Sequence, residues 1–272
     1  MIGQEQIKSR FSRLISENKF PRFLILVGPK GSGRKTLVHW IYQEFGESIL
    51  SVVDISVDAV RQSVTNSYLV GGSKVIYLFA DADTMSNEAK NALLKVTEET
   101  PNNSYFIITL EDESNTLATI RSRAQVFHMD TYSPNELEEY VETKYGENTK
   151  LYVDICDTPG EIDTLYEFGI EEFYQYVVKV VDNIARVSGA NAFKISNKIA
   201  LRDETDKYDL RLFWKAFMTE CFRRAESNID DILYNMSAID ITSSKLRDLR
   251  IKGVNKQMLF DMWLLSIREC WR

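Results

Sequence analysis

Between residues 74 and 123, apolar runs alternate with polar segments in a way that predicts a buried strand, helix and strand. Residues 75–79 and 105–109 are short apolar runs rich in β-branched and aromatic side chains, which is typical of strands buried on both faces. Residues 87–99 have apolar positions at helical spacing, and residues 101–103 (Pro-Asn-Asn) predict a turn before the second strand. Parallel strands joined by a helix predict an α/β fold organised around this unit.

The chain before residue 74 adds elements of the same sheet. Residues 5–17 have the apolar stripe of an amphipathic helix, and residues 23–27 (FLILV) predict a fully buried strand. Residues 51–55 predict a third strand, and a helix follows over residues 57–64, which Ser56 is placed to cap.

A glycine-rich turn, GPKGSGRKT at residues 28–36, joins the strand over residues 23–27 to another apolar helix. Strand, glycine-rich turn and helix form the context of a phosphate-binding loop, because glycines let backbone N–H groups turn inward and the helix N-terminus carries partial positive charge. We therefore predict a degenerate nucleotide-binding loop at Gly28, Gly31, Gly33, Arg34, Lys35 and Thr36.

The spacing of this loop departs from the working motif, in which Gly, four residues and Gly are followed by Lys and then Ser or Thr. Without a gap, Arg34 takes the lysine position and Lys35 takes the place of the hydroxyl that binds magnesium. In an alternative register, Lys35 and Thr36 are the working pair after a one-residue insertion, which swings Lys35 about 100° around the helix. A third interpretation is a turn that binds no nucleotide. The pattern favours the degenerate register, and the other two interpretations stay open.

An acidic turn, Asp81-Ala82-Asp83, follows the strand over residues 75–79. Hydrolysing P-loop proteins place an Asp for magnesium here and, in many ATPases, a Glu that activates water. In this chain the two positions fall on Ala80, which has no group that binds a metal, and on Asp81, which is shorter than Glu. A one-residue shift would bring Asp81 or Asp83 into play, and in the plainer interpretation both acids only cap the next helix.

From residue 133 onward the pattern is helical. Residues 133–136 (Ser-Pro-Asn-Glu) form a capping box with Pro at the first helical position, which predicts a helix start and a domain boundary. The aromatic and methionine side chains that follow predict a helix-bundle core, with apolar faces near Trp263 and Trp271 left for a partner. Residues 188–191 and 203–206 are predicted loops.

The 272 residues carry a formal net charge of -7, which argues against a protein whose whole surface binds nucleic acid. Cys156, Cys221 and Cys270 have no metal-ligand spacing and fit a reducing compartment as free thiols. Neither a signal core nor a run of roughly 18 apolar residues is found. We expect a cytoplasmic protein with no metal centre and no membrane contact.

Several segments together resemble the AAA+ clamp-loader family of bacterial DNA polymerase III and its relatives. The resemblance extends over residues 2–130 in register and more loosely over the helical remainder, and it is most specific between Asn91 and Arg123. It rests on Gly3-Gln4, residues 28–36, Asn91-Ala92-Leu93-Leu94-Lys95, Glu98-Glu99, Pro101, residues 105–109 and Ile120-Arg121-Ser122-Arg123.

The resemblance implies three domains. An AAA+ P-loop domain with a five-stranded parallel sheet would occupy residues 1–131. A small helical lid would follow over residues 132–169, and an all-α collar domain for oligomerisation would occupy residues 170–272.

The resemblance also implies a ring-like pentamer that opens a sliding clamp and places it on primer-template DNA. In that family ATP sites lie between neighbours, and one subunit supplies an arginine finger from a Ser-Arg-Cys motif. The motif stands here as Ser122-Arg123-Ala124, so Arg123 maps onto the finger and would act in trans. A planar, permanently charged guanidinium can neutralise charge on a transferred phosphoryl group. The plainer interpretation is a surface arginine paired to a carboxylate.

The family's phosphate-sensing positions fall near Thr109 and at Glu161, whose charge has the wrong sign for a phosphate partner. We therefore expect a subunit that does not hydrolyse ATP, requires no cofactor and binds ATP or ADP weakly at most. Its expected partners are clamp-loader ATPase subunits, a delta-type subunit, the sliding clamp and, through the assembly, primer-template DNA. Two alternatives are an active ATPase subunit that uses Lys35, Thr36 and Asp81, and an AAA+-like adaptor outside replication.

Overall fold

The computed structural model describes residues 2–146, 150–185, 209–228, 231–249, 251 and 253–271, and the predicted loops at residues 188–191 and 203–206 lie outside them. The chain divides into two compact units. Unit 1 consists of Met1–Glu136 together with Thr158–Gly160, and unit 2 consists of Leu137–Asp157 together with Glu161–Arg272. The predicted boundary between a lid and a collar at residue 170 stays a prediction.

Unit 1 is built on a parallel sheet that has five strands within the described part of the chain, in the order β2-β3-β4-β1-β5. Three central strands are almost entirely buried, because both faces of the sheet are covered. The strands are β1 (Phe23–Val27), β2 (Ser48–Val53), β3 (Lys74–Phe79), β4 (Ser104–Leu110) and β5 (Gln125–His128).

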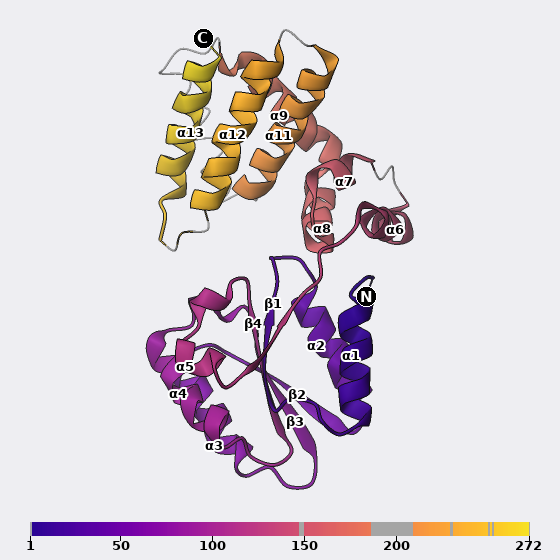
Figure 1. Cartoon of the computed structure of the whole chain (residues 1–272), viewed down its shortest axis with the longest axis vertical. Coiled ribbons are helices and arrows are strands. Elements are labelled where there is room, and N and C mark those ends of the chain that lie inside the picture. The colour runs from indigo at the N-terminus through magenta and orange to yellow at the C-terminus, as the bar shows by residue number, and fades with distance from the viewer. Residues whose placement is uncertain are drawn as a thin grey trace. The chain divides into compact units, whose positions relative to one another are not determined.

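Helices cover both faces of this sheet (Figure 1). On one face, α1 (Glu5–Ser16) and α2 (Arg34–Glu44) bury side chains such as Phe11 and Leu37. The other face is covered by α3 (Val57–Ser67), α4 (Asn87–Glu98) and the short α5 (Ala118–Arg121). Two single turns of 3-10 helix, η1 (Ala82–Thr84) and η2 (Glu113–Asn115), follow β3 and β4. This three-layer arrangement confirms the predicted α/β fold class.

Most predicted boundaries in unit 1 agree with the structure to within one or two residues, and the exceptions are the start of the strand after α2 and the end of α3, which extends to Ser67. The predicted strand at residues 51–55 is β2, which begins at Ser48 because its residues pair one by one with Lys74–Phe79. Ser56 holds the N-cap position of α3, but its side chain makes no capping hydrogen bond. Its backbone N–H instead donates to the Asp54 carboxylate at 2.7 Å.

Unit 2 is made of helices and their connections, and its described residues contain no strand. The helix α6 (Pro134–Tyr145) begins at the end of unit 1, as the capping box predicts, and α9, α11, α12 and α13 then lie side by side (Figure 1). The remaining bounds are α7 (Lys150–Ile155), α8 (Pro159–Phe168), α9 (Ile170–Ile184), α11 (Leu210–Ser227), α12 (Ile232–Asp248) and α13 (Lys256–Cys270). In the described residues, no helix combines the length and apolarity needed to span a membrane.

An aromatic core holds these helices together, with Trp214 and Trp263 both fully buried. The rings of Trp263 and Phe217 pack in a T-shaped arrangement with their centroids 4.9 Å apart, and the Trp263 indole N–H donates to the Thr242 hydroxyl at 2.9 Å. The expectation that Trp263 borders a surface left for a partner is therefore wrong. Trp263 instead faces α11 and α12, the helices that contain Phe217 and Thr242. The sequence pattern did not predict α12.

Candidate functional site

The carboxyl ends of the central strands bring the predicted site residues together at one edge of the sheet. Val27 at the end of β1 pairs with Leu110 at the end of β4, and the Gly28 N–H donates to the Leu110 carbonyl at 3.0 Å. Asp81 lies just beyond β3, which pairs with β4 on its other side. In a doubly wound sheet, this edge is where ligands bind.

Glycine is required at three positions of the loop over residues 28–33. Gly31 and Gly33 have φ of 82° and 85°, in the left-handed region that side chains rarely adopt. At Gly28 an added Cβ would lie 2.6 Å from the Met129 Cγ. Gly33 is also the N-cap of α2, so the first amides of that helix, which have no intrahelical acceptor, lie directly after the loop.

The back of the loop is held by three hydrogen bonds from elsewhere in unit 1 that the sequence did not predict. The donors come from Tyr132 and from the segment Thr158–Gly160, which is distant in sequence. The bonds run from the Thr158 hydroxyl to the Lys30 carbonyl at 3.2 Å, from the Gly160 N–H to the Gly31 carbonyl at 3.0 Å, and from the Tyr132 hydroxyl to the Ser32 carbonyl at 2.8 Å.

Two cations of the loop bind one carboxylate. The Arg34 Nη2 lies 3.1 Å from one oxygen of Asp81, and the Lys35 Nζ lies 2.6 Å from the other. The Arg34 side chain is 5% exposed, whereas that of Asp81 is 50% exposed. Asp81 is held in place from its backbone, because its N–H donates to the Thr109 hydroxyl at 2.9 Å. Thr36 is exposed on the same first turn of α2.

Two buried polar atoms of the loop have no hydrogen-bond partner in the described part of the chain. They are the Arg34 Nη1 and the Ser32 Oγ. Ser32 is 1% exposed, and its Oγ lies 2.8 Å from where a Cβ of Gly28 would stand. Buried polar groups are nearly always bonded in native proteins, so these two atoms are free to bond an additional partner.

Arg123 lies at the surface after α5. One of its nitrogens, Nη2, is 3.0 Å from the Glu98 carboxylate on α4, and the other, Nη1, donates to the Thr119 carbonyl at 3.0 Å. The side chain of Arg123 is 39% exposed and that of Glu98 is 58% exposed. An exposed pair of this kind contributes about 0–1 kcal/mol, so Arg123 is bound to its own chain but not locked there.

Comparisons with known proteins give the family of this fold and site. The family model described as DNA polymerase III, delta subunit, matches residues 51–133. The chain is 27% identical to DNA polymerase III subunit delta' of Haemophilus influenzae over 62% of this chain and 52% of the relative. It is 28% identical to the replication factor C small subunit of Methanosarcina barkeri over 98% of this chain and 82% of the relative. The family model and these relatives support an AAA+ clamp-loader family for this chain.

The extent of these similarities differs among relatives. The chain spans about half the length of the first curated relatives that it matches, with 52% and 46% of their residues aligned. Among solved structures, a mutant of RuvB from Thermotoga maritima resembles this AAA+ chain with a TM-score of 0.51 and 16% identity, over 66% of this chain and 64% of that one. This last likeness shows the fold alone.

In the register without a gap, the donor set of this loop does not fit the magnesium-bound triphosphate of a hydrolysing P-loop protein. In that register, Ala80 and Lys35 stand at the two positions where metal ligands are expected. Asp83 is already used, because its carboxylate accepts from the N–H groups of Glu111 and Asp112 and from the Asn115 amide. Among the described residues, no three His, Cys, Asp or Glu side chains are grouped as metal ligands would be.

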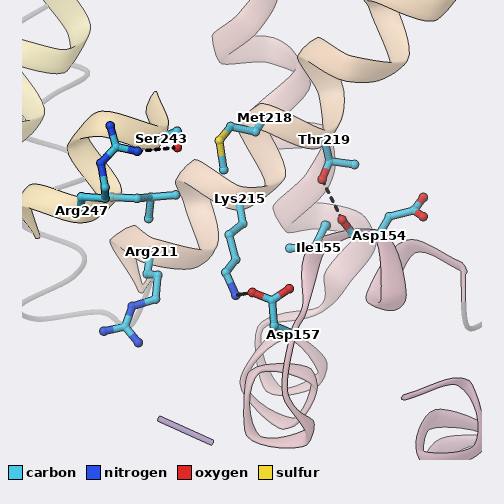
Figure 2. A pocket seen from close by; sticks show the side chains of 10 residues that line it. Asp154, Ile155, Asp157, Arg211, Lys215, Met218, Thr219, Ser243 and Arg247 are labelled. Atoms are coloured by element: carbon cyan, nitrogen blue, oxygen red, sulfur yellow. Dashed lines mark hydrogen bonds and ion pairs between the residues drawn. The ribbon is translucent and has the colours of Figure 1, made fainter. Parts of the chain in front are cut away.

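Glu161, at the predicted phosphate-sensing position, is instead bound within unit 2. Its partner Lys215 lines a pocket of about 370 Å³ between α7, α11 and α12 (Figure 2). The Lys215 Nζ is 2.6 Å from the Glu161 carboxylate and 2.7 Å from that of Asp157. Burial by itself lowers the pKa of Lys215, but the two carboxylates raise it above its ordinary value. Lys215 therefore stays charged, and the Glu161 charge is neutralised inside the unit.

Proposed function

We propose that this chain is a delta prime-like subunit of a clamp loader, that it does not hydrolyse ATP itself, and that it supplies Arg123 to the ATP site of a neighbouring subunit. The reaction that it assists is the loading of a sliding clamp during DNA replication. The similarities to a bacterial delta' subunit and to a replication factor C small subunit support this role.

One observation supports the loss of ATPase activity above all. Arg34 and Lys35, the cations that would meet the phosphates, both bind Asp81. Asp81 stands at the position of the water-activating carboxylate, and its two oxygens are bound by these two cations. Without a metal ligand at Ala80, the loop lacks the parts that position and neutralise a transferred phosphoryl group.

Arg123 has the properties that an arginine finger requires. Its guanidinium lies at the surface and is held only by Glu98 and a backbone carbonyl, so a neighbouring phosphate can replace both at small cost. A triphosphate offers more negative charge than one exposed carboxylate, and its oxygens match the planar fork of arginine.

The proposed partners follow from this role. They are clamp-loader ATPase subunits, a delta-type subunit, the sliding clamp and primer-template DNA reached through the assembly. The chain needs no cofactor for this function, and ATP or ADP binds its own loop weakly at most.

ATP turnover measured with and without a partner tests the proposal. The isolated chain is expected to show no turnover, and its addition to a loader ATPase subunit is expected to raise that subunit's clamp- and DNA-dependent rate. Turnover by the isolated chain that is lost in K35A would instead assign an active site to Lys35, Thr36 and Asp81. No effect on the partner's rate would favour an adaptor outside replication.

A further inference from the structure

We propose that Asp81 is an internal counter-anion that keeps phosphate-class anions out of the glycine-rich loop. When the charge of Asp81 is removed, the loop binds pyrophosphate. This inference concerns the loop of the isolated chain and does not depend on the role of Arg123.

The first argument is the charge that the loop presents. Arg34 and Lys35 bring two positive charges to the start of α2, where the helix adds the partial positive charge of its N-terminus. Asp81 is the carboxylate that both side chains bind, at 3.1 and 2.6 Å. The cluster therefore keeps a net positive charge even with Asp81 ionised, which is the setting of an anion site.

The second argument is the pair of buried donors without an acceptor. The Arg34 side chain is only 5% exposed, and yet its Nη1 has no partner among the described residues. The Ser32 hydroxyl, also buried and without a partner there, belongs to the same loop and lies 2.8 Å from where a Cβ of Gly28 would stand. A phosphate group offers three or more acceptor oxygens at once, whereas the two oxygens of Asp81 bind Arg34 Nη2 and Lys35 and leave Arg34 Nη1 without an acceptor.

The third argument explains why Asp81 excludes a phosphate instead of moving aside. Its backbone N–H is fixed to Thr109 at 2.9 Å, and its φ of 50° is in the left-handed region. Its carboxylate is thus directed to the loop by the backbone. An incoming phosphate would either lie within a few ångströms of the Asp81 carboxylate or displace Asp81 from both cations. Like charges placed this close together oppose binding.

The contact of Asp81 with Arg34 and Lys35 could stabilise the turn or replace an anion ligand, and these two roles predict different results when Asp81 is replaced. If Asp81 only stabilises the turn, its replacement weakens the fold and added anion does not restore it. If Asp81 replaces an anion ligand, the variant is weakened and added pyrophosphate restores its stability, because a ligand that binds only the folded state stabilises it.

The experiment uses the full chain and sodium pyrophosphate as the probe, with affinity from calorimetry and the midpoint of thermal unfolding as a second readout. Asp81→Asn is the main variant, because Asn keeps the shape of Asp and tolerates a positive φ. Asp81→Gly is the second variant, since Gly fits the same backbone best if D81N folds poorly. Asp58→Asn, at an exposed position of α3, is the control for the change in net charge.

Both Asp81 variants are expected to bind pyrophosphate at least about tenfold more tightly than the wild type and D58N. Pyrophosphate should raise the unfolding midpoint of the Asp81 variants only, and the added change Arg34→Met should abolish the gain. Equal affinities of D81N, D81G and the wild type would overturn the proposal, and so would a gain that persists in D81N/R34M. ATP is titrated alongside pyrophosphate. Equal affinities for the two would indicate a site that contacts the phosphate chain alone, and a higher affinity for ATP would indicate a site that also contacts the base. Both of these results support the counter-anion.

Discussion

The Gly160 N–H donates to the Gly31 carbonyl at 3.0 Å, and a Cβ at position 160 would lie 2.5 Å from the Gly31 Cα. The segment Thr158–Gly160 thus approaches the back of the glycine-rich loop as closely as two backbones can. Only glycine permits this approach, at the second residue of α8.

The substitution Gly160→Ala is expected to lower the free energy of unfolding by about 1–3 kcal/mol, because the atom that it would clash with belongs to the backbone. Chemical denaturation measures this change. Gly71→Ala is the matched control, since a Cβ there meets nothing within 4 Å. A G160A variant as stable as G71A would show that the close approach is absent in solution.

The Arg34–Asp81 pair is expected to respond asymmetrically to substitution when no anion is present. Asp81→Asn should destabilise the chain by about 1–3 kcal/mol, because it leaves the charge of a buried arginine with weaker compensation. Arg34→Met should cost less, since it removes the buried charge and leaves the half-exposed Asp81 with Lys35. Urea unfolding of both variants decides the order, and a larger loss in R34M would contradict this account of the pair.

Glu98 is expected to restrain Arg123 without being required for its function. The substitution Glu98→Gln should change the free energy of unfolding by about 0.5 kcal/mol or less, because both side chains are exposed. In a reconstituted loader, E98Q should leave the ATPase rate unchanged or raise it, and the neighbouring control E99Q should leave it unchanged. A loss in E98Q as large as that caused by removing Arg123 would mean that the two residues act only as a structural pair.

The capping box at the start of α6 predicts a dependence of stability on acid. The N–H and hydroxyl of Ser133 donate to the Glu136 carboxylate at 2.8 and 2.7 Å, and these bonds hold the pKa of Glu136 below its ordinary value of 4.5. A lowered pKa adds stability that is present above the unfolded-state value and is lost as the pH falls through the folded-state value.

Glu136→Gln should therefore cost about 1 kcal/mol at pH 7, and the difference from the wild type should shrink as the pH falls below 4.5. Thermal unfolding from pH 7 to pH 3 measures it, with the exposed Glu138→Gln as the control. A difference that stays constant over this range would show that the carboxylate charge plays no part.

The sheet and its helices were largely predictable from the sequence, because a central strand that is buried on both faces has an uninterrupted run of apolar residues. Residues 23–27 illustrate this, since every side chain of β1 is buried. The edge strand β2 was placed less well because it is only partly buried. The aromatic periodicity near Trp263 predicted a helix, but which face is covered depends on α12, whose own pattern is weak.

The contacts of the candidate site were less predictable, because they join segments far apart in the chain. The motif spacing located Arg34, Lys35 and Asp81, but only the fold shows that both cations bind that carboxylate. Likewise, Glu98 was part of the recognised pattern, and its pairing with Arg123 depends on how α4 packs against α5. A sequence pattern shows on which element each residue lies, but it does not show which charged side chain that residue pairs with in the folded protein.

The most direct test of the central claim is the clamp- and DNA-dependent ATPase rate of a reconstituted loader that contains this chain as Arg123→Ala. The matched control is Arg121→Ala, because Arg121 is equally close to the surface, with 41% of its side chain exposed, and meets Glu113 only at 3.9 Å. We expect turnover at the site served by Arg123 to fall on the order of 10³-fold in R123A, with R121A close to the wild type. An R123A loader that hydrolyses ATP at the wild-type rate would contradict the proposed role of this chain.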